Sequence, residues 1–557
     1  MKRIGIIPLS SLLVLSACGG GSDAPAPSPP PPTQHYNVGG SITGLAATGM
    51  VLTNGADNLA VDSTATTFKF PTMVNSGNGY AVAISLQPSG EHCSLANATG
   101  TVGSADVSSV MVTCVARQWT WLSGSQSADQ VGAIGTQGVP GTQNTPGARS
   151  GSASWTDKAG NFWIFSGEAP NQTGNYPQDL WKYSPADGTW TWVAGLDPTT
   201  NSTALPVGVY GTLGVPSAAN VPGGRHWAAT WVDATGNLWL FGGIGADGHG
   251  NWGWLNDLWK FTPGTGQWTW VSGSDTYGAI PVPGTQGVAA ASNVPGGRSR
   301  VQAWTDGQSN LWLYGGIGTA SATVIQGVLG DLWKFDTSTS MWTWVGGVTT
   351  ANAIASFPPK GTSTASATPG GRYGSVTWID RAGDFWLFGG VAYLDATTGG
   401  VLDDLWKYSP VSGTWTWAAG TGMVNAAPSL GAQGVAAAAN GPGSFADTVT
   451  WTDAAGQLWL FGGFWYDVTP TGSTTVYSNQ LWEFRPATGM WTWVAGSATP
   501  NASGTYGTLG TGAPGNTPGS RYLAVGGSDA QGNFLLFGGQ GFGGPNQNGH
   551  LNDLWRF

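Results

Sequence analysis

From about residue 117 to the end of the chain, short apolar runs alternate with turns rich in Gly and Asp, and the same four runs recur in the same order. The first run follows Pro-Gly-x-Arg and is rich in Trp, the second is like residues 237–243, the third is like residues 257–261, and the fourth is Trp-Thr-Trp. Runs of four to seven residues that alternate apolar and polar positions between turns predict antiparallel strands, named here a, b, c and d. Four such strands in a meander make one blade of a β-propeller.

The number of runs of each kind predicts how the ring closes. The Trp-Thr-Trp runs begin 71 to 78 residues apart, at Trp119, Trp190, Trp268, Trp342, Trp415 and Trp491. Strands a, b and c each occur six times, whereas strand d opens the series at Trp119 and is missing after the last strand c, residues 554–557. We therefore expect six blades, with residues 118–122 supplying the outer strand of the blade formed by residues 521–557.

Several b strands end in Phe-Gly-Gly, at residues 241–243, 388–390, 461–463 and 537–539, and a Trp follows downstream. This pattern resembles the kelch repeat over about residues 117–557, and the resemblance implies a kelch β-propeller. The repeats exceed the usual length of about 50 residues. The a–b and c–d turns are short, so the extra length falls in the b–c and d–a loops. Alternate loops of a meander emerge on opposite faces, which places all the elaboration on one face, where we expect binding.

The composition agrees with an all-β chain. It contains 91 Gly, 34 Pro and 32 Trp but only 9% charged residues, against about 25% in an average domain. Helix interiors disfavour Gly and Pro, so a helical bundle is excluded. The formal net charge is −10 and no basic cluster is present, so nucleic acid is not an expected partner.

The N-terminus points to export. Lys2 and Arg3 precede an apolar stretch over residues 4–15 and then Leu-Ser-Ala-Cys ending at Cys18. This resembles a bacterial lipoprotein signal peptide, which implies that residues 1–17 are removed and that Cys18 carries a lipid. An ordinary secretory signal is the alternative. Residues 18–35 form a Pro- and Gly-rich linker. The absence of Asp after Cys18 favours the outer membrane, with the membrane as a partner through the lipid anchor.

Residues 36–116 show short alternating apolar runs separated by Gly, Asn and Ser, which predict a small β-sandwich that looks like an immunoglobulin-like stalk module. Cys93 and Cys114 are 21 positions apart in a chain expected to be exported, so we expect them to form a disulfide. His92 beside Cys93 would offer too few ligands for a metal. No metal and no other cofactor is therefore predicted.

The repeat accounts for 28 of the 32 Trp residues as packing between blades. The aromatic candidates left for ligand binding, with the neighbouring His and the Phe that replaces an Arg in blade five, are Trp227, Trp252, Trp254, Trp465, Tyr466, His249 and Phe445. We expect these residues to form two patches, in the opposed blades two and five. Exposed aromatic rings suit a sugar or a protein partner. The alternative is that they cap the long loops in local cores.

Charged residues also recur with the repeat. Arg begins strand a and Asp precedes strand c in five blades, giving the pairs Arg149 and Asp179, Arg225 and Asp257, Arg298 and Asp331, Arg372 and Asp404, and Arg521 and Asp553. Blade five has Phe445 and Gln480 instead. A ring of Arg side chains at a channel mouth would suit an anion. The joint loss of both residues in one blade favours structural Arg–Asp pairs instead, because losing one partner would leave the other buried and unpaired.

Catalysis finds little support in the residues. The chain looks like the galactose oxidase propeller, but the copper site of that family needs a Cys crosslinked to Tyr and two His. No Cys follows Cys114, and His226, His249 and His550 occupy different positions in their repeats. No nucleophile motif is present. The enzyme interpretation that stays open is a kelch protein like the sialic-acid mutarotases, in which Arg side chains and Glu168 near the channel would act.

We therefore expect a monomeric, lipid-anchored protein of the bacterial cell envelope, periplasmic or surface-exposed, that binds a protein or a glycan through the b–c and d–a loops. A structural envelope protein without a ligand and the sugar-processing enzyme are the alternatives. A binding role is favoured over an enzymatic one.

Overall fold

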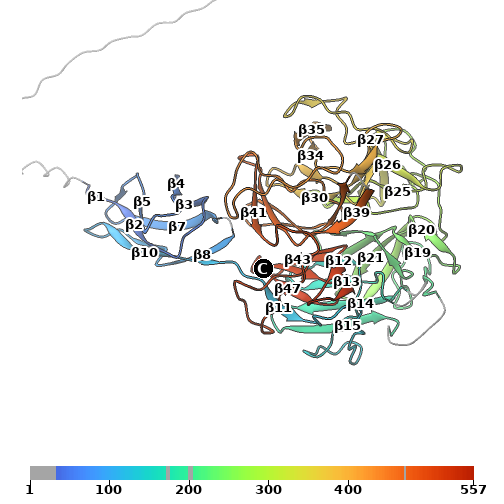
Figure 1. The fold of residues 1–557 in the computed structure, drawn as a ribbon, viewed down its shortest axis with the longest axis horizontal. Helices are drawn as coiled ribbons and strands as arrows, with labels where there is room; N and C mark the ends of the chain where they lie inside the picture. The colour runs from blue at the N-terminus through green and yellow to red at the C-terminus, as the bar shows by residue number, and fades with distance from the viewer. Residues whose placement is uncertain (1–32, 89, 171–175, 198–204, 470–471) are drawn as a thin grey trace, which may run out of the picture.

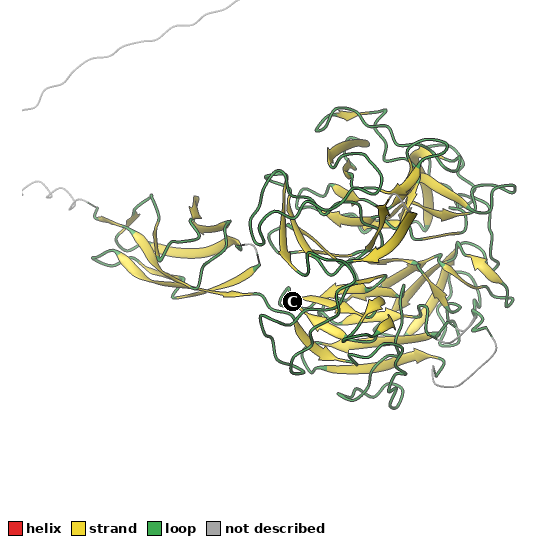
Figure 2. Ribbon diagram, viewed as in Figure 1, coloured by secondary structure: helices red, strands yellow, loops and turns green. Residues whose placement is uncertain are grey.

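The computed structural model describes residues 33–88, 90–170, 176–197, 205–469 and 472–557. The predicted signal peptide, Cys18 and most of the linker lie outside these residues. Within them the regular structure consists of strands, as the composition predicts (Figure 2). No helix in these ranges is long and apolar enough to cross a membrane.

The N-terminal unit is a sandwich of two four-stranded sheets with a core of its own, beside the larger body of the molecule (Figure 1). One sheet has the order β5 (Thr67–Lys69), β2 (Val38–Thr43), β10 (Val107–Ala116) and β8 (Glu91–Ala96). The other has the order β4 (Asp57–Val61), β3 (Met50–Asn54), β7 (Gly79–Leu86) and β9 (Thr99–Thr101), and a short pair joins β1 (His35–Tyr36) to β6 (Val74–Asn75). Fully buried apolar residues such as Val38, Leu52 and Val110 form its core. The predicted disulfide is confirmed: Cys93 in β8 is bonded to Cys114 in β10, directly opposite in the strand register.

The larger body is a β-propeller. In the part of the chain that the structure describes, six sheets share a path of four strands in the order a, b, c, d, which is compatible with the six predicted blades. Their strands are β12 (Ala153–Thr156), β13 (Phe162–Phe165), β14 (Asp179–Ser184) and β15 (Thr189–Gly195) in blade one; β17 (Ala229–Val232), β18 (Leu238–Phe241), β21 (Leu258–Thr262) and β22 (Gln267–Ser272) in blade two; β24 (Gln302–Thr305), β25 (Leu311–Gly318), β26 (Gly327–Asp336) and β27 (Met341–Val348) in blade three; β30 (Val376–Ile379), β31 (Phe385–Phe388), β34 (Leu405–Ser409) and β35 (Thr414–Ala419) in blade four; β36 (Val449–Thr452), β37 (Leu458–Phe461), β40 (Leu481–Arg485) and β41 (Met490–Ala495) in blade five; and β43 (Val525–Ser528), β44 (Phe534–Phe537), β47 (Leu554–Arg556) and β11 (Thr120–Ser123) in blade six.

The predicted closure is confirmed in blade six. Strand β11 pairs antiparallel with β47, with Thr120 opposite Arg556 and Trp121 opposite Trp555. The end of the chain therefore lies beside the start of the propeller (Figure 1). Because the two strands are more than 400 residues apart in sequence, the ring is held by hydrogen bonds and packing, not by a chain connection.

Most of the additional strands belong to the b–c loops, which form short hairpins, and to the residues that precede strand a. The hairpins are β19 (Ile244–Ala246) with β20 (Trp252–Trp254), β32 (Val391–Tyr393) with β33 (Gly399–Val401), β38 (Phe464–Thr469) with β39 (Gly472–Tyr477), and β45 (Gln540–Phe542) with β46 (Asn548–His550). Three of them pair with the short strands β16 (Arg225–His226), β29 (Arg372–Tyr373) and β42 (Arg521–Tyr522); β23 (Arg298–Ser299) pairs with β25. A d–a loop supplies β28 (Ser363–Thr364), which lies against the outer strand of blade four. We call this side of the propeller the loop face and the opposite side the short-turn face.

Tryptophans of strand a link neighbouring blades. The indole N–H of each donates a hydrogen bond to the backbone of strand b in the next blade, as in Trp155 to the carbonyl of Trp239 (2.8 Å) and Trp378 to the carbonyl of Trp459 (2.9 Å). The aromatic repeat thus joins one blade to the next, and the innermost strands are held around a central channel.

Candidate functional site

A closed cycle of backbone hydrogen bonds surrounds the channel at its loop-face end. One residue from each blade takes part, two positions after the repeated Arg or its replacement, and its N–H donates to the carbonyl of the equivalent residue in the preceding blade, over 2.8 to 3.2 Å. All six residues have φ between 51° and 65°. We call them the channel ring: Gly151, Trp227, Arg300, Gly374, Asp447 and Leu523. Four of them are not glycine, although φ in this range is uncommon for other residues.

Three side chains of the ring form a compact group, the channel plug: Trp227, Arg300 and Asp447. The guanidinium carbon of Arg300 lies 3.7 Å from the centre of the Trp227 ring, a cation–π contact. Its Nη1 is 3.1 Å from Oδ2 of Asp447. The two ring glycines make room for the plug. A Cβ at Gly151 would lie 2.5 Å from Trp227, and a Cβ at Gly374 would lie 2.7 Å from Asp447.

The plug contains polar atoms without hydrogen-bond partners. Among the described residues, Nε1 of Trp227, Nε of Arg300 and Oδ2 of Asp447 are buried and accept or donate no hydrogen bond. The contact between Arg300 and Asp447 is short enough for an ion pair but does not have hydrogen-bond geometry. Burial raises the pKa of Asp447, and the charge of Arg300 opposes that shift. Because buried polar atoms in native proteins nearly always have a partner, such a group marks a place for a ligand or ordered water.

His226 lies next to the plug, between Tyr176 and Trp227, with ring centres 4.8 Å and 4.0 Å away. It is 5% exposed, and its Nδ1 is also buried without a partner in the described part of the chain. Burial, with a smaller contribution from the charge of Arg300, lowers the pKa of His226 to about 3. The imidazole is therefore neutral at pH 7.

This shift predicts acid sensitivity. Because the pKa of His226 is lower in the folded state than in the unfolded state, the unfolded state binds more protons between the two pKa values. The free energy of unfolding therefore falls as the pH drops below about 6.5, and it stops falling near the pKa of the folded state. Between pH 7 and pH 4.5 we expect His226 to cost the native protein about 2–3 kcal/mol. Urea unfolding at the two pH values should show that His226→Gln removes this part of the loss. The exposed His249, changed to Gln, is the control and should leave the pH dependence as it is. Equal pH dependence in His226→Gln and wild type would contradict the assignment.

Aromatic side chains continue from the plug across the channel mouth. Tyr176 stacks on Trp252 of β20, with ring centres 4.3 Å apart and planes 20° apart, and both contact His226. On the other side of the plug, the guanidinium of Arg300 lies 5.8 Å from the ring centre of Tyr373. We call these six residues the mouth arc: Tyr176, Trp252, His226, Trp227, Arg300 and Tyr373.

The mouth arc includes residues of blades that the two expected patches did not involve. Burial raises the pKa of Tyr373, and Tyr466 of blade five lies close enough to contribute to that shift. The arc therefore runs from Tyr176 of blade one, through blade two and Arg300 of blade three, to Tyr373 of blade four. Sequence reasoning missed Tyr176, Arg300, Tyr373 and Asp447. The signal that could have found three of them is their position, one or two residues after the repeated Arg or its replacement.

Two of the predicted ligand-binding residues are buried in the core, which corrects their interpretation as exposed rings. Trp465 and Phe445 are 7% and 1% exposed, and their ring centres lie 5.3 Å apart. They belong to the apolar cluster between blades four and five. The physical reason is that blade five lacks the Arg–Asp pair, so apolar side chains fill this position. These two residues cap a local core, the alternative that the sequence left open.

The other aromatic candidates lie nearer the surface. Trp252 and Trp254 are half-buried, and the indole N–H of Trp254 has no hydrogen-bond partner among the described residues. Tyr466 is half-buried against Phe464, with ring centres 5.7 Å apart. His249 is exposed between β19 and β20, where its backbone N–H donates to Asp247 (2.8 Å). Of the seven candidates, Trp227 and Trp252 are those that the structure brings together in the mouth arc.

Each repeated Arg forms an ion pair with the Asp of its own blade. The two terminal nitrogens of the Arg contact the two carboxylate oxygens, and the Nη1–Oδ1 distances are 2.6 to 2.8 Å in Arg149–Asp179, Arg225–Asp257, Arg298–Asp331, Arg372–Asp404 and Arg521–Asp553. These side chains are at most 4% exposed, so the guanidinium groups do not form a ring for an anion. In blade five, Gln480 accepts a hydrogen bond from the indole of Trp482 (3.0 Å), as the Asp does in the other blades.

Within the described residues, the titratable groups near the mouth are not among those placed closely enough to hold a metal ion. In the described residues, the group of three possible ligands is Glu91 with Cys93 and Cys114, and the two cysteines are bonded to each other. Glu168 is half-buried and raises the pKa of Tyr176, where burial is the larger cause. Burial lowers the pKa of His550, and Glu168 opposes that shift. Glu168 thus lies near the aromatic mouth, where the enzyme alternative would need it. His226, His249 and His550, in contrast, occupy different positions in their repeats.

No family model matches the chain, and no curated protein matches it. Among solved structures, the chain is similar to one titled "Structure of YjhT", at 14% sequence identity and a TM-score of 0.43. The alignment covers 76% of this chain and 95% of that one.

Proposed function

We propose that this protein is a lipid-anchored protein of the bacterial cell envelope whose propeller binds a glycan at the channel mouth of the loop face. The mouth arc carries the proposal. The arc places aromatic rings, a cation and polar atoms without hydrogen-bond partners side by side on the loop face. This is the face that carries the long b–c and d–a loops. The anchoring rests on the residues that precede the linker, with Cys18 as the lipidated position.

The chemistry of the arc suits a sugar. A sugar ring has apolar C–H faces and a rim of hydroxyl groups, and aromatic side chains offer apolar faces beside polar edges. The Tyr176–Trp252 stack supplies such faces, and the neutral His226 supplies a hydrogen-bonding edge without a charge. Ligand sites are commonly apolar and aromatic with a few placed polar groups. None of the six residues of the arc is exposed, so the arc is recessed and does not project from the surface. A recessed aromatic site suits a sugar-sized ligand better than a protein partner.

A glycan array probed with the purified full-length chain tests this proposal. We expect Trp252→Ala to weaken binding to the best glycans by about tenfold or more, because the stacking partner of Tyr176 is lost. The matched control is Trp344→Ala, which removes a half-buried Trp from strand d of blade three, away from the mouth. Affinity should then stay at the wild-type level.

The same experiment separates the alternatives. Absence of any bound glycan would favour a structural envelope role, and conversion of a bound sugar would favour the sugar-processing enzyme. Equal affinity in Trp252→Ala and wild type would contradict the mouth arc as the binding surface.

A further inference from the structure

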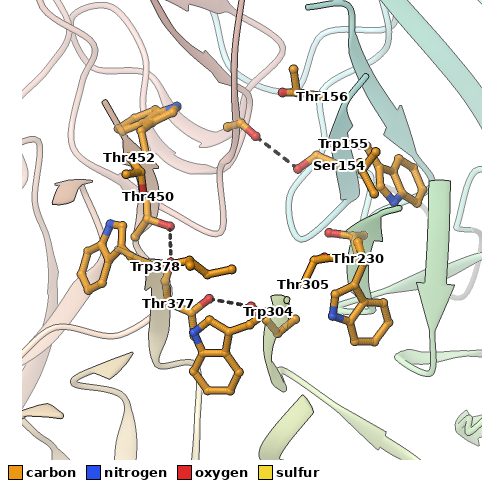
Figure 3. Close-up of a pocket in the computed structure, with 16 residues that line it drawn as sticks. Ser154, Trp155, Thr156, Thr230, Trp304, Thr305, Thr377, Trp378, Thr450 and Thr452 are labelled. Carbon is orange, nitrogen blue, oxygen red and sulfur yellow. Dashed lines mark hydrogen bonds between the residues drawn. The ribbon is translucent and has the colours of Figure 1, made fainter. Parts of the chain in front are cut away.

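We propose that the channel beyond the plug is a second ligand site, for a small neutral molecule rich in hydroxyl groups, such as a monosaccharide or a hexitol. The innermost strands of the blades surround a cavity of about 470 Å³, shown in Figure 3. Sites for small molecules have volumes of roughly 300–1,000 Å³. We call this cavity the threonine chamber. The inference does not depend on glycan binding at the loop face.

The channel is narrower at the plug end of the chamber than in the chamber itself. The channel plug lines an adjoining cavity of about 160 Å³. The two cavities are lined by neighbouring residues of the same segments: Val301 lines the adjoining cavity, and Ala303 lines the chamber. The cycle of ring hydrogen bonds lies at the plug end. At the far end Thr452 is exposed and Thr305 is half-buried. A ligand would therefore enter from the short-turn face.

The wall of the chamber offers hydrogen-bond acceptors. The hydroxyl groups of Ser154, Thr377 and Thr450 donate to backbone carbonyls of the preceding blade, over 3.5, 3.0 and 3.3 Å (Figure 3). A hydroxyl that donates its proton in this way keeps lone pairs that can accept. A ligand with several O–H groups matches such a wall, because its own protons can be donated to these oxygens.

The adjoining cavity contains hydrogen-bond donors of its own. Nε1 of Trp227 and Nε of Arg300 are buried N–H groups that have no hydrogen-bond partner among the described residues, and both side chains line that cavity and not the chamber. A ligand in the chamber is therefore expected to form its hydrogen bonds with the hydroxyl wall.

The chamber disfavours ions. Among the described residues that line it there is no charged side chain. The charges of Arg300 and Asp447 in the plug offset each other, because the two side chains form an ion pair. A charged ligand would lose its hydration without gaining an unpaired counter-charge, which is costly. Neutral sugars and polyols are therefore favoured over sugar acids and amino sugars.

Calorimetric titration of the full-length protein tests the chamber, with glucose, galactose, mannitol and sorbitol as probes. We expect saturable binding of at least one probe with a dissociation constant of about 1 mM or below. Its charged analogues, glucuronate or glucosamine, should bind about tenfold more weakly, because of their hydration cost. Failure of the whole panel to bind, or equal binding of the charged analogues, would overturn the proposal.

Variants locate the site. Thr230→Leu places a larger side chain on the wall of the chamber and should abolish binding, and Thr450→Val, which keeps the shape but removes the hydroxyl, should weaken it about threefold to tenfold. Trp252→Ala on the loop face should leave it unchanged. Thermal unfolding of each variant checks that it is folded. Wild-type affinity in Thr230→Leu and Thr450→Val would overturn the chamber as the site, whereas loss in Trp252→Ala would assign the sugar to the loop face instead.

Discussion

Replacement of Arg372 by Phe is expected to lower the free energy of unfolding by about 3–5 kcal/mol, because it leaves the carboxylate of Asp404 buried without its partner. Both side chains are fully buried and joined by two hydrogen bonds of 2.8 Å. The prediction can be measured by urea unfolding of the full-length chain.

Blade five supplies the matched rescue. It has Phe445 and Gln480 at the positions of Arg372 and Asp404, and Gln480 still accepts the indole hydrogen bond of strand c. The double variant Arg372→Phe with Asp404→Gln should therefore recover most of the stability lost by Arg372→Phe alone. Asp404→Gln alone is the control. It leaves Arg372 buried without its carboxylate partner and should lower the free energy of unfolding about as much as Arg372→Phe does. A double variant as unstable as either single one would show that the two residues are not coupled.

Trp119→Ala is expected to be as damaging, at about 3–5 kcal/mol, because it empties a buried site where the ring closes. Trp119 is 3% exposed, and its ring lies 5.0 Å from Phe557 and 5.2 Å from Phe461. Asn516 donates a hydrogen bond to its carbonyl (3.1 Å). The residue thus contacts the end of the chain and the preceding blade at once. Thermal and urea unfolding should both register the loss.

Trp121→Ala is the matched control for this prediction. Trp121 lies two residues further along, in β11, and is half-buried. Its removal leaves the contacts of Trp119 in place and should cost clearly less. If the two variants were equally stable, packing at the seam between the two ends of the propeller would not hold the ring closed.

Much of the fold was predictable because its signals are local and repeated. Period-two alternation and Gly-rich turns predict strands, and the missing strand d after residues 554–557 predicts which ends must pair. The joint absence of Arg and Asp in blade five likewise indicates a pair, since a buried charge needs a partner. The spacing of Cys93 and Cys114, in a chain expected from its N-terminal residues to be exported, predicted the disulfide.

The candidate site was less predictable because its members occupy equivalent positions in the repeats but are of different residue types. The channel ring contains Gly, Trp, Arg, Asp and Leu, and its common property is a backbone conformation with positive φ. Trp465 shows the reverse case. It looked unassigned by the repeat, yet it is buried against Phe445, and only the packing between two blades shows this.

Taken alone, the order of residues determined the strands, the number of their repeats, the closing pair and the charge partners, because each depends on spacing within one repeat or on a simple count. The tertiary structure decided which side chains of different blades meet at the axis. Closing the ring brings Arg300 into contact with Trp227, 73 positions before it, and with Asp447, 147 positions after it. Such contacts depend on the curvature of the whole ring, for which no local pattern in the chain carries a signal.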